Sequence, residues 1–160
     1  MENTGPLRLG SLRLSLKILV TSFIVFMVLG YGVALVKIYH ISHFSLDEAQ
    51  LYYRGDEASE GVFIPQTFSS LLSVSHVHLF SQPVMFALIG FLFCFSFLRE
   101  KTKSIVIATA FLGILMNTLA PWMVRYGSSQ CVFLFPLSQV LMMPAFFLMV
   151  FVILYEMWRH

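Results

Sequence analysis

The sequence has little charge, and almost all of it lies outside the long apolar stretches. Only 11% of the 160 residues are charged, whereas 58% are hydrophobic and 16% are aromatic. A soluble domain of this length needs a far more polar surface. The net charge of +2 is also too small to indicate nucleic acid as a partner. The absence of charge within the apolar stretches argues against a proton-coupled transporter or a channel.

Cysteine is also scarce, and several catalytic motifs are missing. Cys94 and Cys131 do not form a disulfide pattern, and we expect two free thiols because they lie at opposite ends of predicted helices. No Cys-x-x-Cys-His motif offers a site for covalent c-type haem. The sequence also lacks a Ser-His-Asp set, a phosphate loop, a His-Glu-x-x-His motif and a buried carboxylate pair. These motifs therefore assign no enzymatic activity to the chain.

Four apolar stretches are long enough to cross a membrane, which takes about 20 residues at about 1.5 Å rise each. They are expected at about 18–36, 77–98, 104–122 and 132–155. We therefore predict an all-α fold, a membrane four-helix bundle in which residues 1–160 form a single membrane domain. The N-terminus is basic and then apolar, like a signal peptide, but no small-x-small cleavage site follows. We interpret the first stretch as an uncleaved anchor.

Positive charge is divided unequally between the two sides of the predicted bundle. By the positive-inside rule, this bias places both termini in the cytoplasm, in a multi-pass protein of the inner (plasma) membrane. The long loop at about 37–75 then lies on the outer side, which in a bacterium is the periplasm. Seven cations fall on the inner side and three on the outer: Arg8, Arg13, Lys17, Arg99, Lys101, Lys103 and Arg159 against Lys37, Arg54 and Arg125.

Some polar residues and prolines predict local features. Thr67 follows Pro65-Gln66 and is a plausible N-cap, so the second helix would begin near Phe68 and protrude from the membrane. Pro83 removes a backbone hydrogen bond beneath the histidines described next, and we expect a kink there. Asn117 and Gln139, within the third and fourth helices, are expected to hydrogen-bond across helices.

Four of the five histidines fall at the outer end of the first two helices. Because these helices are antiparallel, we expect His40 and His43 to lie at a depth similar to that of His76 and His78. Imidazole is a common ligand of iron, copper and zinc, and a bis-His pair on facing helices is one way to hold b-type haem. Histidine also suits the wet interface of a membrane, and that role remains an alternative for each of the four.

The helical periodicity ranks these candidates as haem or metal ligands. His76 and His78 are about 200° apart, so both cannot bind one haem iron. We favour His78, which lies deeper in the apolar region. Its most economical partner is His40, because His43 lies farther beyond the predicted end of the first helix. Arg125 and Arg54 are expected on the same side and are candidates to pair with haem propionates.

The segment His76-Val77-His78-Leu79, followed by apolar residues and Gly90, resembles the His-x-His-Leu helix of haem–copper oxidase and nitric oxide reductase catalytic subunits. In those subunits the second histidine ligates low-spin haem, so the resemblance implies this role for His78. The match covers only the segment 76–90, and the chain has far fewer helices and no further ligand set for a copper–haem centre. It is therefore not such an oxidase by itself.

Over most of its length the chain also resembles a small, poorly characterised family of four-helix bacterial membrane proteins. This resemblance implies the fold and the membrane location, and it implies no activity. The motifs that carry it are Tyr53-Arg54-Gly55-Asp56-Glu57, Leu71-Leu72 through His76-Val77-His78-Leu79-Phe80, Ala120-Pro121-Trp122 with Arg125-Tyr126-Gly127, and Tyr155-Glu156-Met157-Trp158.

Our leading functional interpretation is a membrane redox subunit that binds b-type haem near the outer face. It would transfer electrons between quinol and a periplasmic acceptor within a larger respiratory complex, in contact with membrane lipid and other membrane or periplasmic redox subunits. One alternative is a non-catalytic accessory subunit, a scaffold whose outer loop docks a partner. Another is a periplasmic copper or zinc site, to which Asp56 and Glu57 would add oxygen ligands.

Overall fold

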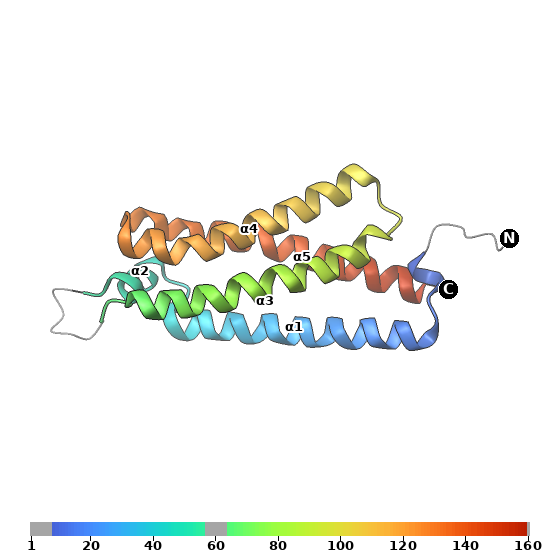
Figure 1. The fold of residues 1–160 in the computed structure, drawn as a ribbon, viewed down its shortest axis with the longest axis horizontal. Helices are drawn as coiled ribbons and strands as arrows, with labels where there is room; N and C mark the ends of the chain where they lie inside the picture. Colours follow the sequence, from blue (N-terminus) through green and yellow to red (C-terminus); the bar gives the residue numbers. More distant parts are fainter. Residues whose placement is uncertain (1–7, 57–63, 160) are drawn as a thin grey trace.

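The computed structural model describes residues 8–56 and 64–159, and this part of the chain is helical throughout, with no strand (Figure 1). Four of its segments are long and apolar enough to cross a membrane: 14–42, 68–94, 100–126 and 129–158. The predicted all-α fold with four spans is therefore confirmed. In chain order the elements are η1 (Leu9–Ser11), α1 (Leu14–Ser42), α2 (Leu46–Arg54), α3 (Phe68–Cys94), α4 (Glu100–Tyr126), η2 (Ser129–Phe133) and α5 (Leu134–Trp158).

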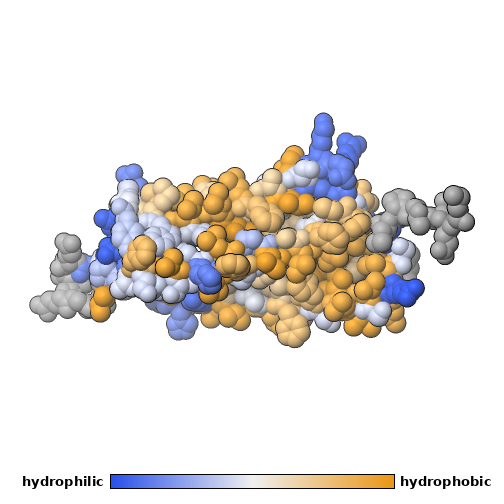
Figure 2. Space-filling model, in the orientation of Figure 1, coloured by the Kyte–Doolittle hydropathy of each residue, from blue (hydrophilic) through white to orange (hydrophobic). Residues whose placement is uncertain are grey.

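The long helices lie roughly side by side and give the bundle two distinct ends (Figure 1). The start of α1, the end of α5 and the α3–α4 turn lie at one end, which we call the terminal end (Figure 1). The short helix α2 and the α4–α5 turn lie at the other, which we call the α2 end. Hydrophobic residues dominate the middle of the surface, and hydrophilic residues gather towards the two ends (Figure 2). This distribution is the one that a membrane-spanning bundle requires.

Helices α1 and α3 extend farther towards the α2 end than hydropathy alone predicted. Helix α3 begins at Phe68, and its N-cap Thr67 accepts a hydrogen bond from the Ser70 backbone amide at 3.1 Å, as expected. Helix α1 continues to Ser42 and stops where His43 and Phe44 adopt left-handed φ angles of 45° and 59°. Much of the predicted loop at 37–75 is therefore helical.

Helix α2 occupies the middle of that segment and is polar, unlike the four spans. Its N-cap Ser45 accepts a hydrogen bond from the Glu48 backbone amide. Asp47 and Glu48 lie in its first turn, where carboxylates stabilise the positive end of a helix. The helix ends at Arg54, before Gly55 at a φ of 79°. The chain therefore turns twice outside the spans before α3 begins.

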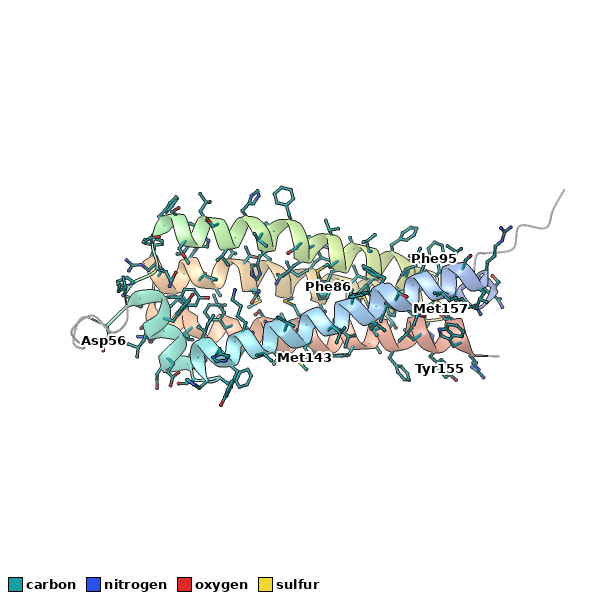
Figure 3. All side chains as sticks on the ribbon, turned by 90° about the horizontal axis from the view of Figure 1, so that it is seen from below. Asp56, Phe86, Phe95, Met143, Tyr155 and Met157 are labelled. Carbon is teal, nitrogen blue, oxygen red and sulfur yellow. The ribbon has the colours of Figure 1, made fainter. Side chains whose placement is uncertain are left out.

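Helices α4 and α5 form the closest pair in the bundle. A Cβ atom added at Gly113 of α4 would lie 2.5 Å from Cγ of Met142 and 3.0 Å from the Ser138 carbonyl oxygen of α5. Small residues allow membrane helices to approach in this way. The hydrophobic core is continuous with this contact and includes Phe86 of α3 and Met157 of α5 (Figure 3). Helix α1 contributes less to it.

A chain of polar side chains joins three helices inside the bundle. The Tyr31 hydroxyl of α1 donates to Gln139 Oε1 at 3.0 Å, and Gln139 Nε2 donates to Asn117 Oδ1 at 3.4 Å. Ser138 Oγ also donates to Asn117 Oδ1 at 3.4 Å. The predicted hydrogen bonding of Asn117 and Gln139 across helices is confirmed, and bonds of this kind contribute roughly 0.6–2 kcal/mol each.

The terminal end is held by two charged side chains that bond to the backbone of the α3–α4 turn. Lys103 is buried; its Nζ donates to the Cys94 carbonyl oxygen at 2.7 Å and pairs with Glu100 at 2.7 Å. Glu156 Oε1 accepts from the Phe97 backbone amide at 2.9 Å. Two backbone groups left open by the turn gain hydrogen-bond partners in this way.

Two local predictions concern the cysteines and Pro83. Both cysteines are free, with Cys94 at the terminal end and Cys131 in η2 at the α2 end, as expected. Helix α3 remains a single helical segment through Pro83. The proline therefore removes one hydrogen bond without dividing the helix.

Candidate functional site

The four candidate histidines lie on α1 and α3, in the half of the bundle nearest α2. His40 is in the last turn of α1 and His43 is its C-cap, whereas His76 and His78 lie in the first half of α3. His40, His43 and His76 are exposed, and His78 is half-buried. Shared depth therefore does not by itself gather these side chains into one site, because three of the four are exposed.

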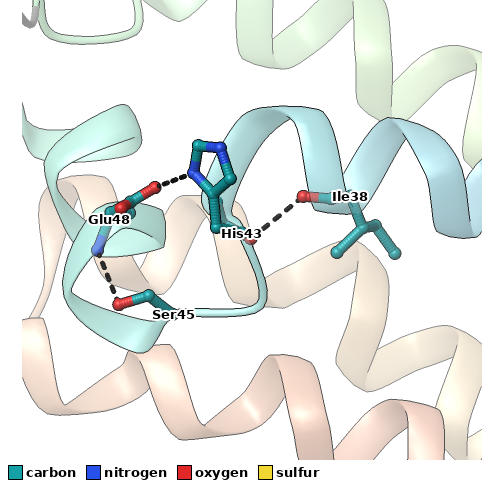
Figure 4. Close-up of polar contacts among 5 residues, drawn as sticks. Ile38, His43, Ser45 and Glu48 are labelled. Atoms are coloured by element: carbon teal, nitrogen blue, oxygen red, sulfur yellow. Dashed lines mark hydrogen bonds and ion pairs between the residues drawn. The ribbon is translucent and has the colours of Figure 1, made fainter.

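His43 is engaged in the turn between α1 and α2 (Figure 4). Its Nδ1 lies 2.6 Å from Oε2 of Glu48. The same glutamate donates its backbone amide to Ser45, and Ser42 Oγ donates to the Ile38 carbonyl oxygen. These contacts close the turn, and they give His43 a structural role as a partner of the carboxylate.

His76 faces outward, as its position about 200° from His78 predicted. Its ring packs against Phe80, with centroids 5.0 Å apart. The two side chains line a shallow hollow of about 500 Å³ on the outer surface of α3, together with Val77, Ser81 and Val84. This hollow faces away from the other helices, so it offers no second protein ligand.

His78 is half-buried on α3. Burial and the charge of Lys37 of α1 both act on its ring, and the Gln82 side chain lies one turn along α3. Of the four histidines, His78 is therefore the one that the fold partly buries.

The described residues contain no group of three or more His, Cys, Asp or Glu side chains that would hold a metal ion. Glu57, which we considered as a possible ligand beside Asp56, lies outside the described residues. The expected gathering of four histidines into one group is thus not observed, and the ligand roles of His40, His43, His76 and His78 stay predictions.

The two candidate arginines bond to backbone carbonyl oxygens. Arg54 Nη1 donates to Val124 and Gly127, at 3.1 Å each, where α4 ends. Arg125 Nε donates to Gln66 at 3.0 Å, and its guanidinium also lies over the Tyr126 ring. The last carbonyls of a helix have no partner within it, and a cation there is favoured by the helix dipole. Each arginine therefore joins two segments of the α2 end.

Aromatic contacts complete the same end. The Tyr53 ring of α2 stacks on Phe135 of α5, with centroids 5.2 Å apart, and burial together with the neighbouring Tyr52 raises the pKa of Tyr53 to about 12. Trp122 Nε1 donates to Ser75 Oγ at 2.7 Å, and its indole packs against Phe68. These contacts attach α2 and the start of α3 to the other helices.

The contacts that Tyr53, Trp122, Ser75 and Gln66 make were not predictable from the sequence alone. One signal was available: Arg54 and Arg125 each lie beside an aromatic residue and near a glycine, in the last turn of a helix. What the sequence did not contain was the pairing, because Arg54 and the carbonyl of Gly127 are separated by 73 positions.

Comparison with known proteins identifies the family and no activity. No curated protein and no solved structure matches the chain. The resemblance of the segment 76–90 to haem–copper oxidases is therefore not supported. Residues 43–160, which include α2 to α5 and leave out all of α1, match the family model of a transmembrane helical domain. The chain therefore belongs to this family of transmembrane helical domains.

Proposed function

We propose that this chain is a non-catalytic accessory subunit of a membrane complex, a scaffold that holds a partner protein at its α2 end. The observation that supports this function is the use of Arg54 and Arg125. Both side chains bond to the chain's own backbone and thereby fix α2 and the adjacent turns in place. A firmly attached polar helix outside the spans is suited to docking, because little ordering remains to be done on binding.

The surface available to a partner is the exposed side of α2 and of the turn before it. Asp47 is exposed in the first turn of α2, and the paired His43 and Glu48 are also accessible. Because Asp47 and Glu48 lie side by side at this surface, a basic patch on another membrane or periplasmic protein would complement it.

The experiment is native gel electrophoresis of the chain solubilised in mild detergent from its own membranes. The wild-type chain should migrate in one defined complex. Arg54→Gln should reduce that complex while the chain stays inserted, because α2 loses its attachment to α4. Lys101→Gln, an exposed cation at the terminal end, is the matched control and should leave the complex intact. Migration of the wild-type chain by itself would contradict the proposal.

A second candidate function is a b-type haem subunit that transfers electrons between quinol and a periplasmic acceptor. The observation that favours it is the partial burial of His78, with the charge of Lys37 of α1 acting on its ring. His40 follows Lys37 by three positions and so shares a face of α1 with it. We propose His78 and His40 as the axial pair, since His43 is paired with Glu48 and His76 faces outward.

This candidate is tested by the absorption spectrum of the purified protein, reduced minus oxidised. Haem ligation predicts Soret and α bands that are lost in His78→Ala and retained in His76→Ala, which removes an imidazole of the same helix. Copper or zinc would instead be detected by elemental analysis. A colourless, metal-free wild-type protein that is correctly folded would exclude both groups and leave the scaffold function.

A further inference from the structure

A groove of about 690 Å³ lies between α1 and α5 near the terminal end. Its lining is apolar and aromatic, and the only polar side-chain groups among the lining residues are the hydroxyls of Thr21 and Tyr155 and the indole N–H of Trp158. Phe151, Tyr155 and Trp158 are 67%, 45% and 44% exposed, so the groove is open to the surroundings of the bundle. The lining comes from Thr21 of α1 and, on α5, chiefly from Phe147, Phe151, Leu154, Tyr155 and Trp158.

Two contacts between α1 and α5 mark the limits of the groove. At the terminal end, Trp158 Nε1 donates to Thr21 Oγ1 at 3.1 Å. Deeper in the bundle, Tyr31 stacks on Phe146, with centroids 5.2 Å apart. The ten residues from Thr21 to Tyr31 span about 15 Å of helix, which is half of a hydrocarbon core about 30 Å thick. The length of the groove therefore corresponds to one leaflet.

The mouth of the groove carries two cations on aromatic rings. Lys17 Nζ lies 5.8 Å from the Trp158 ring centroid, and the Arg159 guanidinium lies 5.5 Å from that of Tyr155. Neither cation is paired with a carboxylate within the described part of the chain. The nearby Glu156 is directed to the α3–α4 turn, where it accepts from Phe97. Net positive charge is thus left at the mouth.

We propose that this groove binds one anionic phospholipid of the leaflet at the terminal end, independently of either proposed function. An acyl chain would lie against Phe151 and Leu154, and Lys17 and Arg159 would bind the phosphate-bearing headgroup. Tryptophan, tyrosine and basic side chains with apolar stems are favoured at this depth of a membrane. A basic residue at the surface contributes attraction to anionic lipid, and two such residues together favour it over a zwitterionic lipid by about 30-fold.

The test is native mass spectrometry of the intact purified chain, titrated with phosphatidylglycerol or with phosphatidylcholine. The wild-type protein should retain one phosphatidylglycerol with about 30-fold preference. The double variant Lys17→Gln/Arg159→Gln should lose that preference. The control Arg99→Gln/Lys101→Gln removes two exposed cations at the same end but away from the groove, and it should keep the preference.

A second variant tests the acyl part of the site. Leu154→Trp fills the groove and should weaken the binding of both lipids. The preference for phosphatidylglycerol over phosphatidylcholine should persist in the binding that remains. Circular dichroism in detergent shows whether each variant is folded. Equal binding of the two lipids by the wild-type protein would overturn the proposal, as would an unchanged preference in the Lys17→Gln/Arg159→Gln variant. Cross-linking of the groove to a second copy of the chain would also overturn it.

Discussion

Arg54 shows how a charged residue at the edge of a membrane bundle is used for structure. Its guanidinium donates to two carbonyl oxygens, of Val124 and Gly127, at the end of α4. These carbonyls have no partner within the helix, and leaving them unpaired costs free energy. Two donors of fixed geometry suit this site better than the single point charge of lysine.

The first prediction at this scale is the effect of Arg54→Ala. We expect the free energy of unfolding to fall by about 1–3 kcal/mol, because the backbone acceptors lose charged donors. Arg54→Lys should recover part of the loss. Thermal unfolding in detergent measures it, with Arg99→Ala, an exposed cation at the other end, as control. Equal stability of Arg54→Ala and the control would show that the two hydrogen bonds contribute nothing.

The second prediction concerns Tyr53, whose pKa is raised from 10.0 to about 12 by burial and by Tyr52. Between these values the unfolded chain has lost the phenolic proton and the folded chain retains it. Stability therefore falls as pH rises from about 10 to about 12, by on the order of 2–3 kcal/mol. Tyr53→Phe removes this dependence. The measurement is thermal stability against pH for both proteins, and parallel curves would refute the raised pKa.

The histidines show what sequence reasoning does and does not provide at the residue scale. Their common depth followed from the antiparallel order of two helices, and the opposed directions of His76 and His78 followed from helical period. The exposure of His40 followed from neither, and the pairing of His43 with Glu48 depends on the left-handed turn at His43 and Phe44. Two successive non-glycine residues with positive φ are uncommon, and the sequence carries no strong signal for them.

At the scale of elements, Gly113 controls the approach of α4 and α5. A methyl group at this position would come within 2.5 Å of Met142 and 3.0 Å of a backbone oxygen of Ser138, and backbone cannot easily move. Gly90, in contrast, would place a Cβ atom 3.7 Å from Ile107, which is an ordinary contact. Gly113 and Gly90 are both buried in helices but differ in the space around them, so alanine at Gly90 serves as the control for alanine at Gly113.

The third prediction uses that pair. Gly113→Ala should lower the free energy of unfolding by about 1–3 kcal/mol, as overpacking of a core does. Gly90→Ala should be neutral or slightly stabilising, since it also raises helix propensity. Comparison of the two melting temperatures in one detergent checks this. A larger loss for Gly90→Ala would mean that α4 and α5 are not in the contact described.

Element boundaries also show where hydropathy fails. The apolar stretches predicted four spans, but α3 begins at Phe68 and not at 77, because its first turns protrude and are rich in serine. Its start was nevertheless predictable from the capping residue Thr67. Helix α2 was not predicted. It is short and polar, and its stability depends on Tyr53 and Arg54 contacting other helices, which is tertiary information.

At the scale of the whole molecule, α1 differs from the rest. It lies entirely outside the matched segment 43–160, and among its residues only Ile24 and Met27 are buried hydrophobics. Its remaining attachments are a few side-chain contacts, such as those of Tyr31 and Thr21. The family unit is thus α2–α5, with α1 packed on one side and leaving the groove beside α5.

A fourth prediction follows from this arrangement. Tyr31→Phe removes the hydrogen bond to Gln139 but keeps the ring stack on Phe146. We expect a loss of roughly 0.6–2 kcal/mol, because the bond lies within the bundle. Native-state proteolysis between α1 and α2 reports release of α1 and should be faster in this variant. Unchanged proteolysis, together with an unchanged melting temperature, would contradict a role for the hydrogen-bonded side chains of Tyr31, Gln139 and Asn117 in holding α1.

Both functional proposals depend on one arrangement, in which the α2 end lies at the outer face and the terminal end in the cytoplasm. Labelling of single thiols in intact cells tests it directly, in a chain carrying Cys94→Ser and Cys131→Ser. A membrane-impermeant maleimide should label Ser128→Cys, exposed at the α2 end, and should label Thr102→Cys, exposed in the first turn of α4, only after permeabilisation. The reverse pattern would contradict the orientation, and labelling of both in intact cells would contradict the four-span fold.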